Sequence, residues 1–421
     1  MGAAETLIGC ESTLLVLGSM RLPKRLRLLG SAGGVYSFLV KGGEDLRNDE
    51  RVQQLLGLMN SVVREGGVSG RGGGGAGLRA RTYSVVPMTP SLGVLEWVPN
   101  TTPLKNVLSQ ELGRHEREQR EMQNQREAQA QAGSYHKMFQ KGTPEASQLY
   151  QQMVATLPPD LLRRRLLTWA PTPEALLTIR SEFGKTLAAS SIFGYILGIG
   201  DRHLENILLD KSGAVVQIDF GVCFGIGTSV LAVPELIPFR LTPQLLGALG
   251  PLEGGGEKGG EGEKEGQEEG DGEQYGGVLC NALQVYLNDP VLDWVDRVTA
   301  VVDNSGGGGD VGAGSGSAGA GGGDITWEPR RRVAAAVGKL RGLGPALLLL
   351  DDLGQNGTVR KQKTLPALER IVWGAGRGQG AQGRGQGRVP VSVGQQADQL
   401  LSLATCPDVL VRQWEGLQTW L

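Results

Sequence analysis

The sequence is poor in the residues that build disulfide scaffolds, zinc sites and membrane spans. Its 421 residues include four cysteines and three histidines, and aromatic residues make up 5%. The cysteines, at positions 10, 223, 280 and 406, share no CxxC spacing, so we expect free thiols in a reducing compartment. No apolar run approaches the roughly 18 residues that would predict a membrane-spanning helix. A membrane partner is therefore not expected.

A large charge of one sign is also lacking. Lys and Arg together number 42, Asp and Glu 44, and the formal net charge is −2. No global field therefore argues for binding to nucleic acid or to an anionic membrane. Glycine, in contrast, occurs 67 times and is concentrated in runs. The tracts 250–277, 304–323 and 374–389 are predicted to be disordered insertions, which leaves enough chain for one two-lobed unit.

The stretch 198–225 contains the clearest chemical signal. Asp201 and Asn206 stand five residues apart, and Asp219 opens an Asp-Phe-Gly tripeptide. Between them, an Asp-Lys-Ser-Gly turn at 210–213 separates two short apolar runs, which predicts a β-hairpin. The hairpin would bring Asn206 close to Asp219. Two oxygen ligands at such a place suit Mg²⁺, which prefers few protein ligands together with phosphate oxygens.

The spacing of these motifs matches the catalytic loop and metal-binding turn of protein kinases. Asp-Phe-Gly alone would be better interpreted as an ordinary turn, but the upstream motif at hairpin distance favours a kinase. The local order is Asp201-Arg202-His203, where ordinary kinases have His-Arg-Asp. This inversion resembles the phosphatidylinositol-3-kinase-related protein kinases. Four further segments resemble the same family: KGGEDLRNDERVQQL, RTYSVVPMTPSLGVLEW, VPELIPFRLT and the terminal WEGLQTWL.

The resemblance implies an α+β, bilobal protein-kinase-like fold with a β-rich N-lobe, a mostly helical C-lobe and glycine-rich disordered insertions. We expect the N-lobe and hinge at 1–98, the C-lobe at 99–389 and a tail like the family's C-terminal FATC domain at 390–421. The tail is predicted to be an amphipathic helical segment. It would bury Trp414 and Trp420 against the activation segment at 222–240.

The resemblance also implies roles for the catalytic residues. Asp201 would deprotonate the substrate hydroxyl, and Asn206 and Asp219 would hold Mg²⁺ or Mn²⁺. His203 would donate to the γ-phosphate, with a cationic imidazole the better donor; a structural hydrogen bond within the loop is the alternative. Arg202 would brace the loop.

The implied ATP site draws on both lobes. Lys41 would hold the phosphates, and a neighbouring acid, Glu44 or Asp49, would aim it. Trp97 would offer an aromatic face to adenine, with core packing as the alternative. The full set of implied ATP-binding residues is Ser19, Lys41, Glu44, Asp49, Tyr83, Glu96, Trp97, Val98 and Ile218.

The function implied is ATP-dependent phosphorylation of Ser or Thr followed by Gln, in nuclear repair of DNA double-strand breaks by non-homologous end joining. Such kinases meet DNA ends and the Ku heterodimer through a helical-repeat region outside these residues, so DNA binding by this chain itself is not expected. The activation segment has no Lys or Arg before Arg240, which favours a protein substrate over a lipid. The alternatives are a relative in DNA-damage or growth signalling, a phosphoinositide lipid kinase, and an inactive kinase-fold scaffold.

Overall fold

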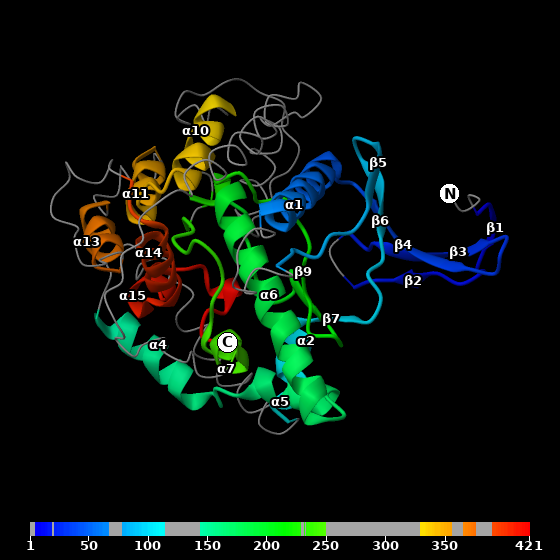
Figure 1. Ribbon diagram of the computed structural model, residues 1–421, viewed down its shortest axis with the longest axis horizontal. Coiled ribbons are helices and arrows are strands. Elements are labelled where there is room, and N and C mark those ends of the chain that lie inside the picture. The colour runs from blue at the N-terminus through cyan, green and yellow to red at the C-terminus, as the bar shows by residue number, and fades with distance from the viewer. Residues whose placement is uncertain are drawn as a thin grey trace, which may run out of the picture.

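The chain folds into an antiparallel sheet with a long helix against it, followed by a larger helical part (Figure 1). The computed structural model describes residues 5–18, 21–66, 78–113, 144–228, 231, 233–249, 329–355, 365–375 and 390–421. This arrangement confirms the predicted α+β, bilobal fold. Ser19, the inserts at 250–277 and 304–323, and residues 376–389 of the third insert lie outside the described residues.

The N-lobe sheet has the strand order β1-β3-β4-β6-β5, and β2 pairs with β3 beside this path. In the register of β4 against β6, Lys41 lies opposite Gly93 and Phe38 opposite Glu96. The candidate lysine and the expected hinge are therefore on neighbouring strands. The strands are β1 (Leu7–Cys10), β2 (Leu15–Val16), β3 (Lys24–Gly30), β4 (Val35–Gly42), β5 (Val85–Thr89) and β6 (Leu92–Glu96).

Helix α1 (Arg47–Gly66) packs against β5 and separates the sheet from the helical lobe (Figure 1). Val52, Leu55, Leu56 and Met59 are all buried on one face, as the helical spacing of apolar residues predicts. These side chains join a core cluster that includes Phe220 of the catalytic region. This packing holds α1 next to the catalytic region.

Helix α6 (Pro173–Leu197) runs through the centre of the C-lobe (Figure 1). Its N-cap, Thr172, accepts a hydrogen bond from the Ala175 N–H at 3.2 Å, and a proline follows the cap, as is favourable at a helix start. The helix ends at Gly198, which has φ 62°. A Cβ there would lie 2.3 Å from the Gly225 nitrogen. Glycine therefore allows the catalytic loop and the activation segment to approach closely.

The remaining C-lobe elements surround α6. A small sheet is formed by β7 (Thr101–Pro103), β8 (Ile207–Asp210) and β9 (Val215–Gln217). None of the helices in the described ranges is long and apolar enough to span a membrane. The other elements are α2 (Leu104–Glu111), α4 (Pro144–Thr156), α5 (Leu161–Trp169), η1 (Ile226–Thr228), α7 (Pro243–Leu249), α10 (Pro329–Leu340), α11 (Pro345–Gln355), α13 (Leu365–Ala375), α14 (Val393–Thr405), α15 (Pro407–Leu410) and η2 (Glu415–Leu417).

The C-terminal tail is helical, as predicted, but the predicted burial of Trp414 is not found. Leu400, Leu403, Val409 and Leu410 are buried, whereas Trp414 is 49% exposed. The prediction that Trp414 is buried was therefore wrong. Helix α15 ends at Leu410, so helical spacing counted across that end does not place a side chain on the buried face.

Candidate active site

The predicted hairpin is confirmed and positions the catalytic loop. β8 and β9 pair with Ile207 opposite Gln217 and Leu209 opposite Val215. The turn is held by Asp210, whose carboxylate accepts hydrogen bonds from the backbone N–H groups of residues 212 and 214 at 2.8 and 2.9 Å. Just beyond the strands, the Ile218 N–H donates to the Asn206 carbonyl at 3.0 Å. Asn206 and Asp219 thus leave the same end of the hairpin.

The two acidic residues have unusual backbones. Asp201 has φ 55° and Asp219 has φ 60°, in the left-handed region that non-glycine residues adopt only where the surroundings hold them. The buried guanidinium of Arg202 supplies part of that support. It donates to the Gly200 and Ile218 carbonyls, both at 2.7 Å, and to the Asp219 carbonyl. The prediction that Arg202 braces the loop is confirmed.

The donor set suits a hard divalent cation. The Asn206 side-chain amide donates to the Asp201 carbonyl at 3.0 Å, which orients the amide and leaves its oxygen as the group available to a metal. The Asp219 carboxylate accepts from the Gly221 N–H at 3.3 Å. Within the described residues, no group of three or more His, Cys, Asp or Glu side chains could enclose a metal. One amide and one carboxylate fit Mg²⁺ completed by phosphate oxygens and water.

Lys41 on β4 forms an ion pair with Glu44, with 3.1 Å between Nζ and Oε1. Burial by itself lowers the pKa of Lys41, but the negative charges of Asp219, Asp49 and Glu44 together raise it above its ordinary value. Glu44 is therefore the direct partner, and Asp49 acts on the lysine from nearby. Burial raises the pKa of Asp49 to about 6, against the opposing effect of Lys41.

Helix α1 also holds the Asp-Phe-Gly turn, which sequence reasoning missed. Asn48 is buried, and its side-chain amide donates to the Phe220 carbonyl at 2.7 Å and to the Cys223 sulfur at 3.0 Å. The Phe220 N–H points back to the Asp49 carboxylate at 3.4 Å. The available sequence signal was a pair of polar residues in the first turn of an otherwise apolar helix face.

His203 is held in one tautomer. Its Nδ1 accepts a hydrogen bond from the Glu205 N–H at 3.2 Å, so in the neutral ring the proton is on Nε2. Burial lowers the pKa of His203, although the Asp201 carboxylate opposes this. The lowered pKa favours the neutral ring, whose Nε2–H remains a donor. Burial likewise raises the pKa of Asp201, with His203 and Arg202 acting in the opposite direction.

The expected adenine site lies at the end of β6. The Glu96 backbone N–H donates to the Ser84 carbonyl at 2.8 Å, and the Glu96 carboxylate accepts from the Ser84 N–H at 2.9 Å. The Trp97 N–H donates to the Ser37 carbonyl at 3.0 Å, and its ring lies 4.6 Å from the Arg25 guanidinium. One face of Trp97 is therefore already used by a cation–π contact.

Two more of the implied ATP-binding residues, Tyr83 and Ile218, border the same core. Tyr83 is buried, and burial raises its pKa well above the ordinary value. Ile218 is half-buried and packs against the core cluster that joins α1 to α6. Val98 packs there too, and its carbonyl accepts from the Thr101 hydroxyl at 2.9 Å.

Arg240, at the end of the activation segment, joins that segment to the tail. Its guanidinium is buried and donates to three tail carbonyls, those of Leu417, Gln418 at 2.9 Å and Leu421 at 3.1 Å. It also reaches the Arg202 carbonyl of the catalytic loop at 3.4 Å. Through Arg240, the tail thus contacts both the activation segment and the catalytic loop.

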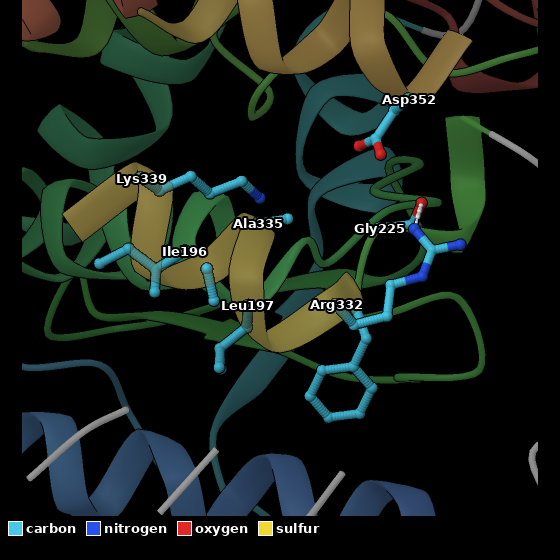
Figure 2. A pocket seen from close by; sticks show the side chains of 9 residues that line it. Ile196, Leu197, Gly225, Arg332, Ala335, Lys339 and Asp352 are labelled. Carbon is cyan, nitrogen blue, oxygen red and sulfur yellow. Dashed lines mark hydrogen bonds between the residues drawn. The ribbon is translucent and has the colours of Figure 1, made fainter. Parts of the chain in front are cut away.

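Helices α10 and α11 line a small pocket together with the end of α6 and the start of the activation segment (Figure 2). Arg332 of α10 donates to the Gly225 carbonyl at 2.9 Å. Lys339, about two helical turns further along α10, donates to the Tyr195 carbonyl at 2.6 Å and lies over the Tyr195 ring. Burial lowers the pKa of Lys339 to about 8, although Asp352 opposes this. These contacts tie the segment to α6.

Comparison with known proteins agrees with this geometry. The sequence signature described as "Phosphatidylinositol 3- and 4-kinase" matches residues 35–292. The chain belongs to this family. Over its whole length it has the fold of a solved structure, "FAT and kinase domain of CtTel1", with a TM-score of 0.56 and 22% identity, covering 100% of this chain and 24% of the other.

The particular relatives are protein kinases of the phosphatidylinositol-3-kinase-related type. The chain is 31% identical to the DNA-dependent protein kinase catalytic subunit of Dictyostelium discoideum and 32% identical to that of Gallus gallus, over 98% of this chain in both cases. It is 31% identical to the serine/threonine-protein kinase SMG1 of Danio rerio over 69% of this chain. The chain spans about a tenth of the length of these relatives, 10%, 10% and 8% respectively. It is a kinase domain of this type, related to the DNA-dependent protein kinase catalytic subunits.

Proposed function

We propose that the chain is an ATP-dependent serine/threonine protein kinase. The observation that supports this most directly is the hairpin, which brings Asn206 and Asp219 to the same end of its two strands, with Asp219 near enough to Lys41 to help raise its pKa. Phosphoryl transfer depends chiefly on positioning and charge stabilisation. An inactive scaffold has no need of Lys41, Asp201, Asn206 and Asp219 together.

Each group has a distinct role in this proposal. Asp201 accepts the proton of the substrate hydroxyl as that oxygen bonds to the γ-phosphorus of ATP and the bond to the bridging oxygen breaks, releasing ADP. His203 donates its Nε2–H to a γ-phosphoryl oxygen, and Lys41 offsets phosphate charge. Asn206 and Asp219 would hold Mg²⁺ or Mn²⁺, which when bound neutralises charge on the phosphates.

The proposed substrate is a protein Ser or Thr followed by Gln, in non-homologous end joining of DNA double-strand breaks in the nucleus. Relatedness to DNA-dependent protein kinase catalytic subunits supports this choice. Ku and DNA ends would act through regions beyond these residues. A phosphoinositide substrate is the second candidate, because the matched family description includes phosphatidylinositol kinases. The absence of Lys or Arg in the activation segment before Arg240 disfavours an anionic headgroup there.

The test offers radiolabelled ATP and Mg²⁺ with three acceptors in parallel: a Ser-Gln peptide, the same composition scrambled, and phosphatidylinositol vesicles. We expect label only in the Ser-Gln peptide, and none with the Asp219→Asn variant as the matched control. Label in the lipid alone would replace the protein-kinase proposal. Absence of label from all three acceptors, with ATP bound normally, would contradict the proposed activity.

A further inference from the structure

The side chain of Glu235, from the segment VPELIPFRLT, reaches back to the catalytic loop. Its Oε1 accepts a hydrogen bond from the backbone N–H of Asp201 at 2.6 Å, across 34 residues of sequence. Its own N–H donates to the Gly227 carbonyl at 3.1 Å. Burial raises the pKa of Glu235 to about 7, and in either protonation state the side chain keeps an oxygen that can accept from the Asp201 N–H.

Two glycines make room for this carboxylate. A Cβ placed on Gly200 would lie 1.9 Å from Glu235 Oε2, and a Cβ on Gly227 would lie 2.1 Å from the same atom. Neither glycine has a left-handed φ, so the close approach of the carboxylate accounts for glycine at both positions. The carboxylate therefore lies in a cradle formed by the catalytic loop on one side and η1 on the other.

The hydrogen bond acts where the loop most needs restraint. Asp201 has φ 55°, a conformation that a non-glycine residue keeps only when its neighbours enforce it. Arg202 restrains the loop through its side chain, by donating to the Gly200 and Ile218 carbonyls. Glu235 restrains it at the neighbouring residue, by accepting from the Asp201 N–H itself.

We propose that Glu235 is a positioning residue, which fixes the backbone of Asp201 and thereby the direction of its carboxylate toward the substrate hydroxyl. The kinetic part of this inference rests on the proposed kinase function. The structural part, restraint of the loop, does not. Glu235 also makes activity depend on the correct path of the activation segment, because the acceptor lies in that segment.

The first test compares Glu235→Gln with Glu235→Asp. Glutamine keeps an acceptor oxygen at the same reach, so we expect kcat within about three-fold of the wild-type value. Aspartate is one methylene shorter and loses the contact, and we expect kcat to fall by about ten- to a hundred-fold, the usual cost of a misplaced catalytic group. The KM for ATP should stay within about two-fold, because Lys41, Asn206 and Asp219 are untouched. Glu111→Gln is the matched control, since Glu111 is a partly buried glutamate paired with Arg165 at 2.7 Å.

The second test is a double-mutant cycle with Gly227→Ala. Alone, this change should displace the carboxylate and lower kcat about as much as Glu235→Asp does. Combined with Glu235→Ala it should add little, because the nearest remaining neighbour, Val222, lies 3.4 Å from the new Cβ. Additive effects of the two changes would contradict the proposal. So would a Glu235→Asp variant with wild-type kcat.

Amide hydrogen exchange separates this inference from the proposed function. Glu235→Asp should speed exchange of the Asp201 amide by at least ten-fold, whereas Glu111→Gln should leave it unchanged. If the wild-type protein phosphorylated none of the offered acceptors, the kinase proposal would fail. The exchange result would still decide whether Glu235 restrains the Asp201 backbone. Unchanged exchange at Asp201 in Glu235→Asp would overturn it.

Discussion

Replacing Arg240 by methionine should release the C-terminal tail and abolish phosphotransfer, although Arg240 contacts no reactant in the proposed reaction. The change keeps an apolar stem and removes the donors to the Leu417, Gln418 and Leu421 carbonyls. A buried acceptor left without a donor costs about 1 to 3 kcal/mol. The contact with Leu417 is fully buried, whereas those with Gln418 and Leu421 are partly exposed. The buried contact alone therefore accounts for about 1 to 3 kcal/mol of a typical domain stability of about 5 to 15 kcal/mol.

The assay measures turnover together with amide exchange of residues 411–421 and of the catalytic loop at 199–206. We expect faster exchange in both segments, because Arg240 also donates to the Arg202 carbonyl at 3.4 Å. Exchange in α1 and the N-lobe sheet should not change. Arg240→Lys should fall between the two proteins, since an ammonium group lacks the planar fork of the guanidinium.

The matched control is Arg164→Met. Arg164 pairs with Asp160 four residues earlier at 2.9 Å, and both side chains are substantially exposed, so its loss should change stability by no more than about 0.5 kcal/mol. The reasoning would be refuted if Arg240→Met kept wild-type turnover and wild-type protection in the tail.

Three further outcomes follow from the site. Asp201→Asn and Asp219→Asn both keep a side chain that tolerates the left-handed backbone, and both should abolish phosphoryl transfer. Only Asp219→Asn should weaken Mg-ATP binding in a fluorescence titration. Equal affinity of the two variants for Mg-ATP would contradict the assignment of Asp219 as a metal ligand. For the apo protein, Asp49→Asn should raise the free energy of unfolding at pH 7.5 by up to about 3 kcal/mol, because the pKa of Asp49 is raised from 3.8 to about 6 on folding. A raised carboxyl pKa means stability that is present below pH 3.8 and lost as the pH rises through 6, so the two proteins should converge in urea unfolding at pH 4; a constant difference would exclude this cause. Trp414→Ala should change the melting temperature by less than Arg240→Met does, because Trp414 is 49% exposed, and a larger loss would mean that the side chain is buried in solution.

The elements predicted well from sequence are those determined locally. The β8–β9 hairpin follows from its turn residues, and the Asp210 carboxylate makes the turn contacts that such a sequence favours. Helix α1 follows from the spacing of its apolar residues, four of which are buried. Strand β5, in contrast, begins only at Val85, because the Tyr83 N–H just before it donates to the Gln53 side chain at 3.0 Å. Helix α1, which carries Gln53, therefore sets the start of this strand, and the local sequence pattern contains no sign of that contact.

The residues that sequence reasoning missed share a different property. Asn48, Glu235 and Arg240 each bind backbone groups of a distant segment: Asn48 reaches Phe220, Glu235 reaches Asp201, and Arg240 reaches the tail. A backbone carbonyl or amide carries no side-chain signature. Pairing such a group with its polar partner therefore requires the fold, whereas a carboxylate near a lysine can be anticipated from residue types alone.

In the proposed kinase, this property would let the tail affect catalysis without supplying a catalytic group. The Asp201 backbone is restrained by Glu235 and Arg202, the Arg202 carbonyl accepts from Arg240, and Arg240 is bound to the tail. The tail makes a second contact with the activation segment, where the Leu236 N–H donates to the Gln413 side chain at 3.3 Å. Each link is a hydrogen bond to backbone, so its loss shifts the loop rather than changing the charge of a reacting group. Tail variants should therefore lower kcat at nearly constant affinity for Mg-ATP, whereas loss of a metal ligand lowers both.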